Sequence, residues 1–209
     1  MHPNPAFRQD SEAAALRFAA ERGFGVLSVN GAAGPLLAHV PLLLAADGKS
    51  AEIHLARSNA IARAGLPAPA VFAVIGPDAY VSPDWYGAED QVPTWNYVAV
   101  HLRGVLEPME AGAIRGMVEA LSAVHEGRLA PKRPWTSAKM APEALERMLR
   151  MILPFRLRIE RVEATFKLNQ NKTKAMRDGV IAALEAAPGV GGPGAIAALM
   201  RGLEDRGDG

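Results

Sequence analysis

Three consecutive polar residues, Arg57, Ser58 and Asn59, follow a segment with the pattern of a short strand. Ser58 or Asn59 could cap a brief helix, and backbone N–H groups at a helix start attract anions. Together with the Ser58 hydroxyl and the Arg57 guanidinium, such a turn could hold a phosphate. An ordinary helix cap beside a solvated arginine explains the same spacing, so both interpretations stay open.

A second group of candidates is aromatic and lies between positions 80 and 97. Trp85, Tyr86 and Trp95 could cover one end of a barrel, or they could wall a pocket for a planar ligand. Asn96 stands beside Trp95, directly before a well-patterned strand. An amide next to a large ring suits the edge of a heterocycle, which makes this pair the more suggestive half of the segment.

Basic residues are dense between positions 147 and 177, where Glu160 and Glu163 are the carboxylates that oppose them. The segment could be a patch for the phosphates of a cofactor or of nucleic acid, or the solvated face of a strand and two helices. A helix-turn-helix is not indicated, because the element after residues 145–151 has the pattern of a strand. The basic residues are Arg147, Arg150, Arg156, Arg158, Arg161, Lys167, Lys172, Lys174 and Arg177.

Other kinds of chemistry find little support in the sequence. There is no cysteine, which removes disulfides, thiolate nucleophiles and cysteine-based metal sites. The five histidines show neither HxH nor HExxH spacing, and Ser82 lacks the glycines of a nucleophile elbow. A Gly-rich phosphate loop is also missing. Metal catalysis and serine hydrolysis are therefore poor predictions.

Composition sets the class of protein. The 209 residues are 49% hydrophobic and 22% charged with a net charge of +1, which predicts an ordinary globular chain rather than a polycation that coats nucleic acid. Neither a signal peptide nor an apolar run of bilayer length is visible. We therefore expect a soluble, cytoplasmic protein.

The elements that must position these residues begin with strands. Strands are predicted over residues 24–30, 36–44, 51–56, 70–75, 97–106 and 155–160, with a bulge or bend near residue 161. Helices are predicted over 11–22, 59–64, 112–125, 142–153, 171–184 and 195–204. Strands that come first and helices at the edges predict an α+β fold built on an antiparallel sheet, closed or split into a barrel. One domain is expected over 1–185, followed by a Gly/Pro-rich linker and short tail over 186–209.

Several segments, in this order, carry a family resemblance. They are Ala-His-Val-Pro at 38–41, His-Leu-Ala-Arg-Ser-Asn at 54–59, Tyr-Val-Ser-Pro-Asp-Trp-Tyr at 80–86, Pro-Thr-Trp-Asn-Tyr at 93–97 and Phe-Lys-Leu-Asn-Gln-Asn-Lys at 166–172. With them the chain resembles the FMN-binding negative transcriptional regulator family, the PaiB-like proteins, from its first residues to about residue 184. The sequence departs from that pattern at Asn169, where many members have serine, and at Lys172-Thr173, where proline is frequent.

The resemblance implies a split β-barrel similar to the pyridoxamine 5'-phosphate oxidase-like flavoproteins. It further implies a homodimer that binds FMN at the subunit interface. In such barrels the strand with Ala38, His39 and Val40 meets the isoalloxazine edge. Arg57, Ser58 and Asn59 would form the phosphate turn. The resemblance also assigns Thr94, Trp95 and Asn96 to the ring or to the second subunit, and Lys167, Gln170 and Asn171 to closing the site.

Three functions remain to be weighed. The first is an FMN-binding split-barrel protein of the negative transcriptional regulator family. The second is a flavin-dependent oxidoreductase or flavin reductase, in which the cofactor carries the redox chemistry and no catalytic acid or base is needed. The third is a repressor that binds DNA through the basic segment. This third function loses its main support if Arg156, Arg158 and Arg161 pair with carboxylates or point to separate faces.

Overall fold

The computed structural model describes residues 2–8, 11–187 and 192–204. Its strands are β1 (Phe24–Gly31), β2 (Gly34–Pro41), β3 (Leu43–Leu44), β4 (Ser50–Ala56), β5 (Ala68–Val81), β6 (Thr94–Pro108) and β7 (Ile152–Lys167). Its α-helices are α1 (Glu12–Arg22), α2 (Ala113–Gly127), α3 (Pro142–Leu149), α4 (Lys174–Ala186) and α5 (Pro193–Glu204). Short 3-10 helices are η1 (Pro5–Phe7), η2 (Ile61–Arg63), η3 (Pro83–Tyr86) and η4 (Ser137–Lys139).

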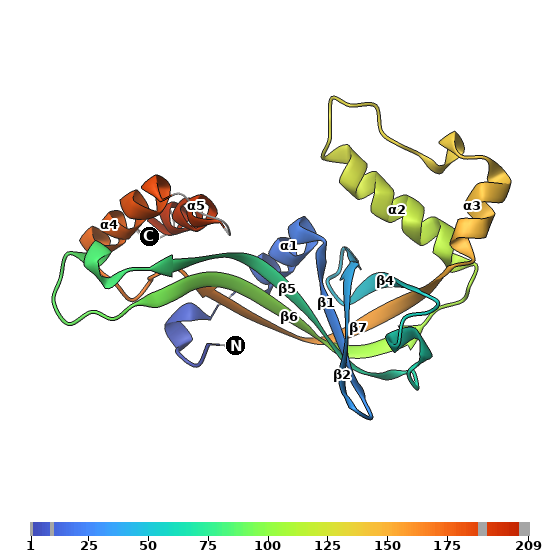
Figure 1. Cartoon of the computed structure of the whole chain (residues 1–209), viewed down its shortest axis with the longest axis horizontal. Coiled ribbons are helices and arrows are strands. Elements are labelled where there is room, and N and C mark those ends of the chain that lie inside the picture. The colour runs from blue at the N-terminus through green and yellow to red at the C-terminus, as the bar shows by residue number, and fades with distance from the viewer. Residues whose placement is uncertain (1, 9–10, 188–191, 205–209) are drawn as a thin grey trace. The chain divides into compact units, whose positions relative to one another are not determined.

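The strands form one sheet in the order β2-β1-β5-β6-β7-β4-β3 (Figure 1). The pairs β1–β2, β1–β5, β3–β4 and β4–β7 are antiparallel. Helices follow the strands or flank them, as the segregated sequence pattern predicts. The fold is an α+β split β-barrel with peripheral helices, which confirms the predicted class.

The chain divides into two compact units, which are described separately. Unit 1 comprises residues 1–15, 75–100 and 163–209, and unit 2 comprises residues 16–74 and 101–162. Unit 2 therefore holds the four short strands with α2 and α3, whereas unit 1 holds α4 and α5. The three longest strands contribute residues to both units. Among the described residues, none of the helices is both long and apolar enough to cross a bilayer.

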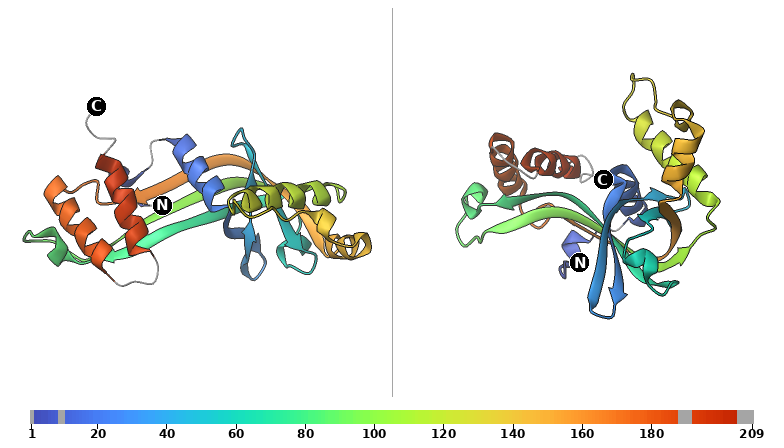
Figure 2. Two further views of the ribbon diagram at one scale, coloured as in Figure 1. Left: turned by 90° about the horizontal axis from the view of Figure 1, so that it is seen from above. Right: turned by 45° about the vertical axis from the view of Figure 1, so that its right-hand side comes forward.

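The hairpin of β1 and β2 forms one side of unit 2 (Figure 2). Its register runs from Phe24 opposite Pro41 to Gly31 opposite Gly34, and the φ of +124° at Gly34 suits the tight turn. The sequence predicts one strand over 36–44, but β2 ends at Pro41 and β3 pairs with β4 instead. Proline has no N–H to donate to a ladder, which explains the break.

In the same unit, α2 and α3 pack their apolar faces together. Ile114, Met117 and Leu149 are buried in one cluster, with Leu145 and Ile152 against it. The helix predicted over 142–153 ends at Leu149, and Pro154 lies inside β7, opposite His54 of β4. Pro154 therefore does not end the helix, because it lies inside the strand that follows.

Unit 1 is built from helices on the ends of long strands. Helices α4 and α5 lie side by side (Figures 1 and 2) and bury Ile181 and Leu184 on one side and Ile196 and Met200 on the other. The helix predicted over 195–204 is thus confirmed as α5. The expected linker lies partly outside the described residues, at 188–191, and the boundary at 185 stays a prediction.

The start of α4 differs from the prediction. Thr173, not Asn171, is the N-cap, and its hydroxyl accepts a hydrogen bond from the backbone N–H of Met176 at 3.4 Å. Before it, the backbone N–H of Lys172 donates to the carbonyl of Asn169 at 2.9 Å, which closes a turn. That turn occupies residues 169–172, so the helix begins later than the sequence pattern suggests.

Candidate functional site

The predicted phosphate turn lies in unit 2, between the end of β4 and η2. The Asn59 side-chain oxygen accepts a hydrogen bond from the Ile61 backbone N–H at 2.9 Å, so Asn59 shapes the turn. The Arg57 side chain is exposed, and its Nε donates to the carbonyl of Arg150 at 3.1 Å. Its backbone N–H also donates to the carbonyl of Met151 at 2.9 Å. Arg57 is thereby fixed in place while its terminal nitrogens stay available.

A cavity of about 320 Å³ opens beside Arg57. Four charged side chains line this cavity. Arg115 and Glu146 form an ion pair, whereas Arg57 and Arg150 have no carboxylate within ion-pair distance among the described residues. The cavity is therefore cationic. Its lining residues are Arg57, Ala111, Gly112, Ile114, Arg115, Glu146, Leu149, Arg150 and Ile152.

Sequence reasoning found only part of this cavity. The sequence predicts Arg57 as part of the phosphate turn and Arg150 as part of the basic segment, but it does not predict that the two arginines line one cavity. Arg115 was missed altogether, since an isolated arginine on a helix carries no positional signal. The cavity depends on β7 entering directly after α3, which brings Arg150 beside the end of β4.

The predicted ring-binding strand lies in the same unit. Ala38 and Val40 are buried, 6% and 9% exposed, while His39 between them is exposed. β2 is an edge strand of the sheet, and an edge strand presents backbone N–H and C=O groups that a ligand can use. It also lies against β4 and η2, the two elements that flank the phosphate turn. β2 and the two elements that flank the phosphate turn are therefore in contact within unit 2.

The remaining predicted residues lie in unit 1. Lys167 donates a hydrogen bond to the Thr94 hydroxyl, so these two residues meet. Trp95 is 54% exposed and stacks edge-on against Tyr80, with ring centroids 6.2 Å apart. Asn96 is fully buried, and its Nδ2 donates to the Met200 sulfur at 3.5 Å. Trp95 and Asn96 therefore point to opposite faces of β6, and their shared role at one ring stays a prediction.

Gln170 and Asn171 differ in their side-chain hydrogen bonds and exposure. The Gln170 side chain accepts a hydrogen bond from the Leu168 backbone N–H at 2.8 Å and donates to the Phe166 carbonyl. These two hydrogen bonds therefore stabilise the turn that ends β7. Asn171 is exposed. Their contribution to a cofactor site also stays a prediction.

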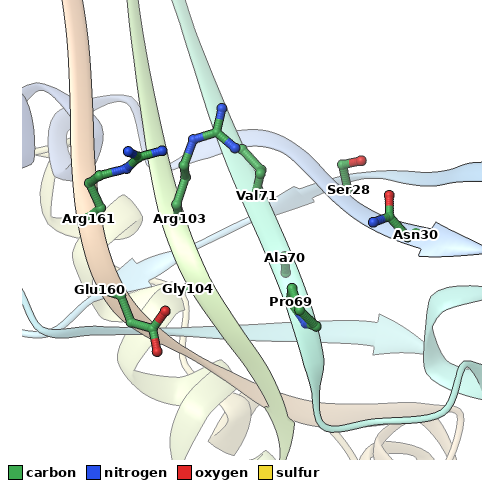
Figure 3. Close-up of a pocket in the computed structure, with 9 residues that line it drawn as sticks. All are labelled: Ser28, Asn30, Pro69, Ala70, Val71, Arg103, Gly104, Glu160 and Arg161. Carbon is green, nitrogen blue, oxygen red and sulfur yellow. The ribbon is translucent and has the colours of Figure 1, made fainter.

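A second cavity of unit 2, of about 550 Å³, involves none of the residues predicted to bind FMN, although Arg161 of the basic segment lines it. In Figure 3 the Arg103 and Arg161 side chains extend from neighbouring strands toward the same side, with Ser28 and Asn30 on β1. No motif in the sequence connects Arg103 with Arg161 or points to this hollow. The lining residues are Ser28, Asn30, Pro69, Ala70, Val71, Arg103, Gly104, Glu160 and Arg161.

Part of the basic segment is neutralised by carboxylates. Arg156 lies 3.6 Å from Glu52, and Arg158 lies 3.3 Å from Glu107 and 2.8 Å from Glu160. Pairing of these arginines was the condition under which the DNA-binding interpretation loses its main support, and the structure meets it for Arg156 and Arg158.

The residues present fit FMN. The cofactor carries a phosphate dianion, and guanidinium groups suit phosphate because their planar N–H groups donate in pairs and stay charged at every working pH. Arg57 and Arg150 supply two such groups without a compensating carboxylate among the described residues. The β2 edge supplies backbone donors and acceptors of the kind that the polar edge of a flavin ring requires.

Comparison with known proteins identifies the family. Residues 1–161 match the family model described as "Putative FMN-binding domain". The chain is 30% identical over 171 residues to "Protease synthase and sporulation protein PAI 2" of Bacillus subtilis (strain 168), which covers 80% of this chain and 81% of that protein.

Solved structures agree at the level of the fold. The FAD and heme binding protein from Mycobacterium smegmatis superposes with a TM-score of 0.55 at 19% identity, covering 77% of this chain and 73% of that one. A conserved hypothetical protein from Mycobacterium tuberculosis gives a TM-score of 0.57 at 16% identity, covering 82% and 92%. The chain therefore belongs to the FMN-binding domain family, as a split-barrel protein of the PaiB-like negative transcriptional regulators with FMN as its cofactor.

Proposed function

We propose that this FMN-binding regulator-family protein holds its flavin in unit 2, with the phosphate between Arg57 and Arg150 and the ring along the edge of β2. The observation that carries the proposal is the cationic cavity, where both guanidinium groups lack a carboxylate partner among the described residues. Because the Arg150 carbonyl holds Arg57 Nε, the guanidinium is oriented before a ligand arrives.

The other residues of the site have distinct tasks in this proposal. The exposed Ser58 hydroxyl donates a further hydrogen bond to the phosphate, and the backbone of residues 38–40 orients the ring. Ala38 and Val40 pack inward and keep the strand in register, so only His39 projects outward. Bound FMN supplies one- and two-electron redox chemistry, while the protein sets its position and surroundings.

We further propose a homodimer, located in the cytoplasm. Unit 1 exposes a set of apolar side chains on and between β5 and β6: Ile75 is 56% exposed, Tyr80 46%, Val92 73% and Trp95 54%. Exposed apolar side chains gathered on adjacent elements are typical of protein–protein contact surfaces. A second copy that covers Trp95 would bring Thr94 and Trp95 toward the flavin of its neighbour, as the family resemblance implies. The lack of cysteine suits a reducing compartment.

Flavin retention tests the cofactor site. The purified protein is incubated with FMN, freed of excess ligand and measured by visible absorbance; we expect about one flavin per subunit. Arg57→Ala should weaken FMN binding by about 1.5–3 kcal/mol, roughly 10- to 150-fold in Kd, because a charged hydrogen-bond donor is lost.

A matched control comes from the same unit. Arg156→Ala also removes an arginine, but one that is paired with Glu52 and does not line the cavity, so it should bind FMN like the wild type. Unchanged FMN affinity in Arg57→Ala and Arg150→Ala would remove the phosphate from this cavity.

Light scattering tests the dimer. The wild type should have twice the mass of one chain, and Trp95→Glu should shift it toward the monomer, because a carboxylate would be buried in the interface. A Trp95→Glu protein that stays fully dimeric would exclude this face.

A further inference from the structure

Two lysines of unit 1 stand out because their ammonium groups have only neutral partners. Lys167, at the end of β7, donates to the Thr94 hydroxyl and lies 5.7 Å above the Phe7 ring centroid. Lys172, in the turn before α4, donates to the Gln91 side-chain oxygen at 2.6 Å and lies 4.9 Å above the Tyr86 ring centroid. Neither ammonium has a carboxylate within ion-pair distance in the part of the chain that the structure describes.

Holding these two charges together is unfavourable in the absence of an anion. Burial, followed by the positive charge of Lys172, lowers the pKa of Lys167 from its ordinary value. Both side chains are half-buried, so water screens their repulsion less than it would on an open surface. Elsewhere in the same unit, Lys174 is paired with Asp178 at 2.9 Å.

An unsatisfied donor lies in the same turn. Asn169 is 2% exposed, and its side-chain oxygen accepts a hydrogen bond from the Tyr86 hydroxyl at 3.3 Å. Its Nδ2 is buried and has no hydrogen-bond partner. Its φ of +61° lies in the left-handed region, which most residues other than glycine avoid. A buried N–H group without an acceptor is costly, and such groups usually have a partner.

We propose that Lys167, Lys172 and the Asn169 amide form an anion-binding site for the carboxylate or phosphate group of a small molecule. The three groups offer only N–H donors that remain free to bond, and the acceptors already present, Thr94 and Gln91, are neutral. An anionic oxygen group would neutralise the two ammonium groups and supply acceptors for the unused donors. None of these three residues lines the cavity of unit 2 that is proposed for the flavin phosphate.

The test uses the full chain loaded with FMN and labelled with ¹³C and ¹⁵N at lysine. Inorganic phosphate and succinate are titrated as separate probes while NMR follows the lysine side-chain signals. We expect saturable shifts at Lys167 and Lys172, and a rise in the lowered pKa of Lys167 when the anion binds. The probe that binds more tightly identifies the source of the anionic group.

Variants make the assignment specific. Lys172→Gln should weaken probe binding by roughly tenfold or more, because one charged donor is lost, and Lys172→Arg should restore much of it. Lys174→Gln is the matched control, since that lysine already has a carboxylate partner, and it should bind the probes like the wild type.

Three results would overturn the proposal. The first is a titration in which neither probe produces saturable shifts at Lys167 and Lys172. The second is equal probe binding by Lys172→Gln and the wild type. The third is loss of FMN from Lys172→Gln to the same extent as from Arg57→Ala, which would assign the lysines to the cofactor. If only the proposal for the flavin cavity is wrong, Arg57→Ala will bind FMN like the wild type, while the probes still bind at Lys167 and Lys172.

Discussion

The two compact units bring backbone segments together in different ways. In unit 2, Gly104 of β6 lies so close to β7 that a Cβ there would be 1.8 Å from the Arg158 carbonyl oxygen. In unit 1, Gly179 of α4 approaches η3, where a Cβ would be 2.4 Å from the Trp85 carbonyl oxygen. The first contact joins two strands of one sheet, and the second joins a helix to a short turn. A sheet is fixed by its ladders, whereas a helix can shift on its neighbour.

The units also treat their positive charges differently. In unit 2, Arg57 and Arg150 are exposed and line the same cavity. In unit 1, Lys167 and Lys172 are half-buried against aromatic rings, and burial lowers the pKa of Lys167. The comparison teaches that one chain can present positive charge in two ways, on solvated arginines or on partly desolvated lysines, and that desolvation makes the second arrangement the more costly one without an anion.

The largest effect is expected at the strand–strand contact of unit 2. Gly104→Ala should lower the free energy of unfolding by about 3 kcal/mol or more, because the new methyl group meets backbone that cannot move without breaking the sheet. Urea denaturation measures this change. If Gly104→Ala lowers the free energy of unfolding less than Gly179→Ala does in unit 1, the comparison is contradicted.

A new methyl group at the helix contact of unit 1 should lower the free energy of unfolding less. Gly179→Ala is expected to lower the free energy of unfolding by about 1–2 kcal/mol, since overpacking against Trp85 is partly offset by the better helix propensity of alanine. The same urea series provides the value. Full wild-type stability would show that α4 moves away from η3 freely.

A glycine without close neighbours separates packing from propensity. Gly116 lies on the exposed side of α2, and a Cβ there would have no heavy atom within 4 Å. Gly116→Ala should therefore raise the free energy of unfolding by roughly 0.5–1 kcal/mol, because alanine loses less backbone freedom on folding. Thermal or urea denaturation of Gly116→Ala serves as the control for the substitutions at Gly104 and Gly179. If Gly116→Ala is destabilised, the losses at the other two glycines cannot be attributed to their close contacts.

The smallest effect concerns pH and unit 2. Burial lowers the pKa of His54 from its ordinary value of 6.5, so the unfolded chain binds the proton more readily. This contribution to stability is complete above pH 6.5 and is lost as the pH falls through the lowered pKa. Unfolding free energies measured between pH 7 and 5 should therefore fall less steeply for His54→Gln than for the wild type. Parallel curves would show that His54 titrates alike in both states.

Local pattern predicted most of the secondary structure. The alternation of Val98, Val100 and Leu102 gave β6, and the helical spacing from Ile114 gave α2. Two errors lie near prolines: the strand predicted over 36–44 is broken after Pro41, and the helix predicted over 142–153 ends before Pro154. Whether a proline ends an element depends on the element's neighbours, and Pro154 is accommodated inside β7 opposite His54.

The sequence by itself determined the family, the α+β class and the cofactor, because motifs and periodicity are local properties of the chain. Only the tertiary structure decided which charges are neutralised. Glu52 stands opposite Arg156 because β4 and β7 pair in one register, and a shift of one residue would have turned them to opposite faces. The same pairing brings Arg150 to Arg57 across 93 positions of sequence. Charge cancellation depends on distances between elements, and those distances exist only once the sheet has formed.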